Sequence, residues 1–193
     1  MIQTKNDQID RIVQGDILSD VDLIEYVDII NGQTKVSMIR FPLVIVLTQD
    51  CDLTWDYSSR SSEKGNDDKL LFSVIVAPMY NYEHFINGEH LSDLGQTMQT
   101  ISSKKEKTDN KFLRHNETPR YHYLEFDDTI PLVNSVIDFK HYFTVNVERL
   151  QEHKKSHYVC TVSELFREQI SQRFANYLSR IGLPEIGQRQ GNH

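Results

Sequence analysis

Cysteine, glycine and proline are all scarce in this chain of 193 residues. Its two cysteines, Cys51 and Cys160, exclude a disulfide-stapled secreted scaffold and favour a reducing compartment, so we expect a cytoplasmic protein. Eight glycines and five prolines exclude collagen-like and low-complexity classes. Apolar runs are all far shorter than the ~20 residues that span a bilayer, and the N-terminus lacks a signal-peptide pattern. We therefore expect no membrane association.

Basic residues are also in deficit, because 21 Lys and Arg against 28 Asp and Glu give a net charge of -7 at pH 7. Proteins that grip nucleic-acid backbones usually carry a basic face. Basic side chains do cluster within 104–107, 111–120 and 149–155, so nucleic acid stays an open but disfavoured partner. The length suits a single domain over residues 1–193.

The first half of the chain has the pattern of β-strands. Residues 22–30 (DLIEYVDII) are rich in β-branched and aromatic side chains. Asn31-Gly32 follows, the dipeptide preferred in tight hairpin turns because both central positions need positive φ. Residues 33–40 then return with one shared face, formed by Thr34, Val36 and Met38. This segment predicts a β-hairpin.

Two apolar runs follow the hairpin. Pro42 interrupts the pattern, and residues 43–47 (LVIVL) and 69–79 (KLLFSVIVAPM) then predict strands that are buried on both faces. Residues 55–68 (WDYSSRSSEKGNDD) lie between these strands and are polar, charged and Ser-rich. We expect them to form an exposed, mobile loop.

The remainder mixes helices and strands. In order, we expect one or two short helices within 83–101, a charged linker at 102–110, strands at 121–126 and 136–147, and a C-terminal helix. Thr161 and Glu164 have the spacing of a capping box at the start of that helix. An apolar stripe then follows at helical spacing, made of Leu165, Phe166, Ile170, Phe174, Tyr177, Leu178 and Ile181.

These elements predict an α+β fold that is mainly β. We expect an SH3-like small antiparallel barrel with a helical insertion and a closing C-terminal helix. The predicted barrel core covers about 12–80 and 119–160, the helical and charged insertion about 83–118, and the closing helix 162–181.

The most distinctive polar segment is Thr48–Asp52 (TQDCD), directly after a predicted buried strand. In an extended chain Asp50 and Asp52 project to one face and Cys51 to the other. The two carboxylates could hold a hard cation. Alternatively, they cap a turn beside a buried Cys51, and this is the interpretation we favour. Cys51 is a poor nucleophile candidate, because flanking carboxylates disfavour the thiolate.

A second group comprises His153, His157 and Cys160, which are zinc-ligand residue types at helical spacing. Residues 156–161 have the pattern of a strand, however, which turns His157 away from Cys160. The sequence also offers no obvious fourth ligand next to these three residues. We therefore expect neither a metal ion nor another cofactor.

A third group interleaves cations with aromatic rings: Arg114, Arg120, Tyr121, His122 and Tyr123. This pattern suits the stacking of single-stranded RNA. It suits the anchoring of a protein interface equally well. An ordinary strand edge is the simplest interpretation. Phosphate-binding glycine loops, G-x-S-x-G and H-E-x-x-H are all absent from the sequence, which disfavours the familiar hydrolase, kinase and metalloprotease classes.

The order of motifs and predicted strands from residue 15 to residue 78 resembles that of the PemK/MazF-like toxins. Residues 15–18 (GDIL) match their Gly-Asp-Ile/Val turn, and residues 40–48 (RFPLVIVLT) resemble their Arg-Pro followed by an apolar strand. The resemblance implies an SH3-like barrel that is usually dimeric, and a metal-free endoribonuclease that cuts single-stranded RNA.

Two features depart from that family. Phe41 separates Arg40 from Pro42, and the family's catalytic Thr or Ser, expected after the next apolar strand, is missing where residues 73–77 run into Pro78. Of the chemistry that RNA cleavage needs, only the cation that stabilises the phosphorane can be assigned, to Arg40.

We therefore expect a non-catalytic interaction or regulatory protein of a bacterial or phage system, of the toxin–antitoxin or phage-defence type. It would bind a protein partner, or a second copy of itself, through the end of the barrel, residues 114–123 and the C-terminal helix. The first alternative is a PemK/MazF-like endoribonuclease with Arg40, Arg120 and His122 as candidate catalytic residues. The second is a metal-dependent enzyme that uses Asp50 and Asp52.

Overall fold

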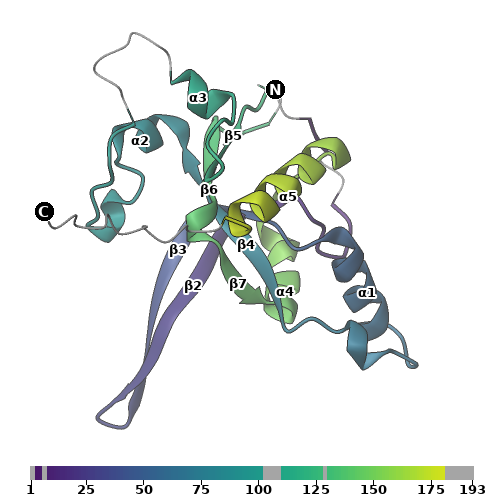
Figure 1. The fold of residues 1–193 in the computed structure, drawn as a ribbon. Coiled ribbons are helices and arrows are strands. Elements are labelled where there is room, and N and C mark those ends of the chain that lie inside the picture. Colours follow the sequence, from purple (N-terminus) through teal and green to yellow (C-terminus); the bar gives the residue numbers. More distant parts are fainter. Residues whose placement is uncertain (1–2, 6–7, 102–109, 128–129, 181–193) are drawn as a thin grey trace, which may run out of the picture.

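The computed structural model describes residues 3–5, 8–101, 110–127 and 130–180, and there eight antiparallel strands form one curled, half-barrel sheet (Figure 1). The strands are β1 (Thr4–Lys5), β2 (Asp16–Ile30), β3 (Gln33–Val46), β4 (Ser73–Asn81), β5 (Tyr121–Leu124), β6 (Ser135–Asp138), β7 (Phe143–Asn146) and β8 (Tyr158–Val162). Their order is β1-β8-β2-β3-β4-β6-β5, and β7 also pairs with β4. The fold is α+β and mainly β, as predicted.

Helices surround the sheet. The α-helices are α1 (Asp50–Arg60), α2 (Tyr82–Asn87), α3 (Lys111–Arg114), α4 (Val147–His157) and α5 (Glu164–Leu178), and the 3₁₀ turns are η1 (Asp67–Lys69), η2 (Ser92–Leu94) and η3 (Phe139–His141). Within the described ranges, none of these helices is both long enough and apolar enough to cross a membrane.

The hairpin prediction is confirmed. β2 and β3 meet at Asn31 and Gly32, whose φ angles of 51° and 76° are the positive values that the turn requires. The predicted break at Pro42 is wrong, because β3 continues through it. Pro42 has no register partner on β2, and β4 pairs with β3 only from Val44, so the missing N–H interrupts no ladder.

The sheet centre is buried on both faces, as the apolar run 43–47 predicted. Val44 and Val46 belong to one hydrophobic cluster, whereas Ile45 and Leu47 belong to the cluster on the opposite face. Alternate side chains of a strand project to opposite faces, so β3 links two cores. Helix α4 packs on the first cluster through Leu150, and α5 packs on the second through Ile170 and Phe174.

The loop predicted at 55–68 is wrong in part, because α1 continues to Arg60 and η1 begins at Asp67, although most of these residues are exposed as expected. The polar residues of this segment form the solvated face of a helix whose other face is buried. Leu53 is 3% exposed, and the buried Asp56 carboxylate accepts hydrogen bonds from the Arg60 side chain and the Leu71 amide. Composition alone suggested a loop, but these contacts stabilise a helix.

The other elements agree with the sequence in part. Short helices do occur within 83–101, as α2 and η2, while the linker predicted at 102–110 lies almost wholly outside the described residues. The strand predicted at 136–147 is divided into β6 and β7 by η3, which begins where Asp138 accepts the Lys140 amide. Helix α4 follows and was not predicted.

The closing helix is present as α5, but its predicted capping box is wrong. Ser163 precedes the helix without a side-chain cap, and Thr161 lies in β8, where its hydroxyl donates to Asp16 over 2.5 Å. Leu165 of the predicted apolar stripe is 79% exposed, and Ile181 lies outside the described residues.

Candidate functional site

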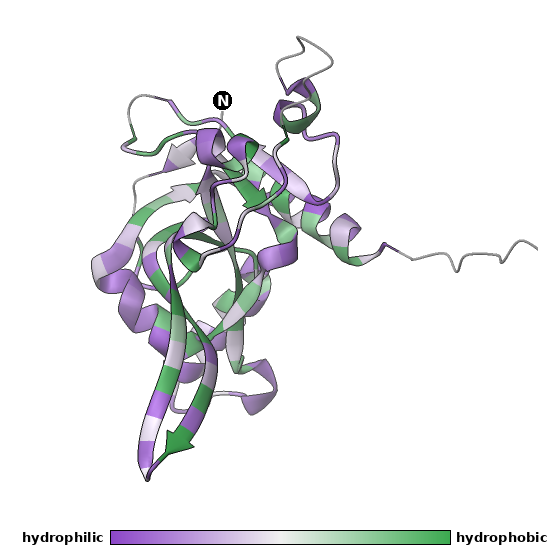
Figure 2. Cartoon of the chain, turned by 90° about the vertical axis from the view of Figure 1, so that its left-hand side faces the viewer, coloured by the Kyte–Doolittle hydropathy of each residue, from purple (hydrophilic) through white to green (hydrophobic). Residues whose placement is uncertain are grey.

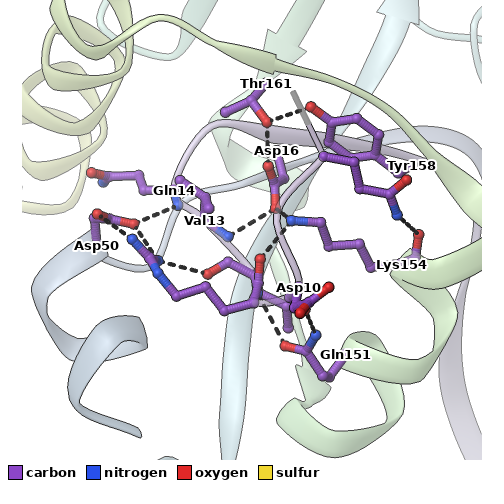
Figure 3. A network of polar contacts seen from close by, with 12 residues as sticks. Asp10, Val13, Gln14, Asp16, Asp50, Gln151, Lys154, Tyr158 and Thr161 are labelled. Carbon is purple, nitrogen blue, oxygen red and sulfur yellow. Dashed lines mark hydrogen bonds and ion pairs between the residues drawn. The ribbon is translucent and has the colours of Figure 1, made fainter. Parts of the chain in front are cut away.

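The segment 48–52 is not extended, and α1 begins at Asp50. Asp50 and Asp52 therefore lie about 200° apart around the helix instead of sharing a face. Arg11 donates two hydrogen bonds to the Asp50 carboxylate, at 2.8 and 3.0 Å (Figure 3). Arg167 lies 3.7 Å from the same carboxylate. Burial acts to raise the pKa of Asp50, but Arg11, aided by Arg167 and the Gln14 amide, brings it below its ordinary value. Asp50 is a structural anion in this arrangement.

A buried ion pair lies beside Asp50, in the same polar network (Figure 3). Lys154 of α4 donates to Asp16 at 2.8 Å and to the Arg11 carbonyl at 2.6 Å, and both side chains are almost fully buried. The second oxygen of Asp16 accepts from Thr161, and the first also accepts from the Val13 amide. Both oxygens of this carboxylate accept hydrogen bonds, and these join β2, α4 and β8, which gives Asp16 a structural role.

The metal-ligating residue types stay dispersed. In the part of the chain that the structure describes, His, Cys, Asp and Glu side chains form no group of three or more that could hold a metal ion. His153 and His157 stack on α4 with ring centroids 3.9 Å apart, but Cys160 is buried in β8, where burial raises its pKa to about 12. Cys51 is exposed rather than buried.

Arg120 is part of a polar chain beneath the sheet edge. It donates to both oxygens of the buried Asp138, at 2.8 and 2.5 Å. His141 Nδ1 lies 3.7 Å from the same carboxylate and 2.9 Å from the Tyr80 hydroxyl. Burial lowers the pKa of His141 and raises that of Tyr80, so both groups are neutral near pH 7. The Asp138 charge is matched by Arg120.

The other residues of the predicted aromatic and basic group differ in burial, and the group includes the exposed Arg114. Tyr123 is 8% exposed and contacts the Tyr82 ring edge-on, and Arg114 lies over that same Tyr82 ring. Tyr121 is half-buried, with Arg120 over its ring. These contacts use the rings that RNA stacking would need.

His122 is 2% exposed and packs near Phe139. Its Nδ1 atom makes no hydrogen bond in the described structure. Burial, with the nearby positive charge of Arg173, lowers its pKa to about 3. His122 is therefore neutral at physiological pH and enclosed by protein atoms.

A cavity of about 320 Å³ lies against β3, β4 and the segment after α2. Arg40 and Tyr80 both line it, together with apolar side chains of which Phe41 and Met79 are typical. Arg40 is 64% exposed in its side chain and forms a two-point ion pair with Asp22, at 2.8 and 3.2 Å. Arg120 and His122 do not line this cavity, so the three candidate catalytic residues are not brought together.

The most unusual surface is the outer part of the β2–β3 hairpin, residues 22–40, which we call the arm. It projects from the body as a two-stranded ribbon (Figure 1). β8 pairs with β2 only over Asp16–Leu18, and β4 pairs with β3 only over Val44–Val46. Among the described strands, none pairs with either edge of the arm.

One face of the arm is mainly apolar beyond the Asp22–Arg40 pair at its base. Cross-strand partners share a face, and the pairs on what we call the outer face are Ile24 with Met38, Val27 with Val36, and Ile29 with Thr34. The five apolar members are 42% to 72% exposed, and hydrophobic residues continue to the tip (Figure 2). The opposite face points to the core at its base, where Leu23 and Ile39 pack against the first cluster.

A β-bulge creates this face. The register of β2 shifts between Ile24 and Tyr26, leaving Glu25 as the extra residue. Without the shift, Ile24 would project opposite to Val27 and Ile29. The sequence correctly placed Thr34, Val36 and Met38 on one face. It missed the exposure of that face, because the strands predicted at 22–30 and 33–40 are much shorter than the observed β2 and β3 of 15 and 14 residues.

No family model matches the chain, and no curated protein matches it either.

Replacing Lys154 with Met should destabilise the fold by about 3–5 kcal/mol, because Asp16 would stay buried without its cation. Urea unfolding followed by circular dichroism measures this loss. Lys155→Met is the matched control, since the Lys155 ammonium is exposed and pairs with Glu152 on the surface. We expect little or no loss of stability in that control. Equal losses for the two variants would contradict a special role for the buried pair.

The His122 environment predicts an acid-sensitive fold. The folded pKa of about 3 lies below the ordinary 6.5, so between these values only the unfolded chain binds the proton. Stability should fall by about 2 kcal/mol between pH 7 and pH 5 from this residue alone. His122→Leu should flatten that slope, measured by urea unfolding across the range. The exposed His115, changed to Gln, is the control, and an unchanged slope in His122→Leu would refute the assignment.

Proposed function

We propose that this chain is a non-catalytic interaction protein whose docking surface is the outer face of the arm. The supporting observation is the exposure of five large apolar side chains on one face of an otherwise isolated hairpin. Contiguous apolar surface of this kind is typical of protein–protein interaction sites. A two-stranded hairpin is also marginally stable in water, so a covering surface would stabilise the arm.

The charges of the arm favour a protein as the occupant. The arm carries three acidic side chains, Asp22, Glu25 and Asp28, against two basic ones, Lys35 and Arg40. Arg40 is already paired with Asp22. Nucleic acid and anionic lipid both select basic surfaces, which this ribbon lacks.

Site-specific photocrosslinking in the native host tests the proposal. The crosslinking residue p-benzoylphenylalanine, placed at Ile29 of the outer face, should give a discrete protein adduct on irradiation. The same residue at Phe72, which is 93% exposed outside the arm, is the control and should give none. The absence of an adduct at Ile29 would refute the proposal. The adduct's identity also tests the finer hypothesis of a toxin–antitoxin or phage-defence system.

A second candidate function is a PemK/MazF-like endoribonuclease on an SH3-like barrel. One observation favours it: Arg40 and Tyr80 line the same cavity, and the Tyr80 hydroxyl is hydrogen-bonded to His141. Arg40 would supply the cation that stabilises a phosphorane. The neutral His141, reached through the Tyr80 hydroxyl, would supply the proton acceptor for the same substrate. Asp50 and Asp52 support no comparable metal-dependent alternative, since Arg11 occupies the Asp50 carboxylate.

Overexpression tests this second candidate. An active endoribonuclease should stop growth, and Arg40→Ala should restore it because the cation is lost. Asp22→Ala breaks the same exposed ion pair but keeps the cation, so the growth arrest should persist in that control. Both changes should leave stability almost unchanged, as exposed ion pairs contribute little. Wild-type expression without a growth defect would exclude the nuclease.

A further inference from the structure

We infer that the occupant of the outer face is the outer face of a second copy of this chain. The inference rests on the proposed function and names the partner for the same surface. The arms would lie face to face and run in opposite directions about a two-fold axis. An interface of this kind uses one patch twice, so the patch must be complementary to itself.

The chemistry of the outer face meets that requirement. Between Ile24 and Thr34 its side chains are aliphatic or Met, with one threonine hydroxyl and no charge. Asp28 and Lys35 are cross-strand partners on the opposite face, so the like charges of two copies are kept out of the contact. Asp22 and Arg40, at the base of the outer face, already neutralise each other. Packing two such faces together therefore leaves no unpaired charge in the interface.

The geometry also suits two antiparallel arms. Val27 and Val36 lie midway along the outer face, so an axis through this pair places the Ile24–Met38 end of one arm over the Ile29–Thr34 end of the other. The arm projects beyond the helices, so the two bodies would lie at opposite ends of the joined ribbons (Figure 1).

The size of the face sets the expected strength. With five side chains 42% to 72% exposed, two outer faces bury on the order of 1,000 Å², the lower bound of a specific interface. We therefore expect a reversible dimer whose population depends on concentration. An identical chain is also the one partner present whenever the protein is made, which suits a hairpin that is marginal on its own.

The experiment is sedimentation velocity on the purified full chain, from about 1 to 100 µM. We expect conversion from the 22.6 kDa monomer to a species of twice that mass as concentration rises. Val27→Lys and Val27→Glu should each weaken the dimer about tenfold or more, because each buries two like charges at the axis. Val27 is 58% exposed, so both variants should stay folded, which circular dichroism verifies.

Mixing the two variants gives the decisive result. A heterodimer should form on mixing Val27→Lys with Val27→Glu, because opposite charges then meet. Gln33→Lys adds the same charge on the opposite face of the arm and should dimerise like the wild type. A chain that stays monomeric at 100 µM, or a dimer insensitive to both Val27 changes, overturns the inference. Photocrosslinks from Ile29 to a different protein would then leave the proposed interaction function standing without self-association.

Discussion

The buried ion pair between Asp16 and Lys154 is the interaction on which the rest of the structure depends. It joins β2 to α4, and through Thr161 it also joins both to β8. Isolated charges this deep are costly, so each partner requires the other. Gly15, with φ near 86°, lets the chain turn immediately before Asp16, where a Cβ would approach Arg167 and Val162 closely. One buried carboxylate and one buried ammonium therefore hold β2, α4 and β8 together.

The molecule divides into two parts with different sources of stability. The body buries strands on both faces, and helices α4 and α5 cover opposite sides of the sheet. The arm has only its own ladder, a turn at Asn31-Gly32 and one apolar face open to water. The polar chain from Arg120 to Tyr80 and the network around Asp50 both belong to the body. The arm is thus the part of the described chain that is best suited to a partner.

Local chemistry decided which features could be predicted from the sequence. The hairpin turn, the strand buried on both faces and the shared face of Val36 and Met38 depend on neighbouring residues, and all were predicted correctly. Helix α1 could not be predicted from composition, because its stability comes from Asp56, which binds the amide of Leu71 fifteen residues away. The environment of Asp50 could not be predicted for the same reason, since Arg11, which neutralises it, is distant in sequence.

Because of the bulge at Glu25, the number of residues in β2 determines which side chains share a face of the arm. Two strands of unchanged composition present an apolar face or a mixed face according to whether that one extra residue is present. A homologue that lost a single residue here could keep every hydrophobic side chain and still lose the continuous stripe. Comparisons of related chains should therefore weigh length between Asp22 and Asn31 above residue identity. Insertions and deletions in this segment, more than substitutions, would separate chains that associate from chains that do not.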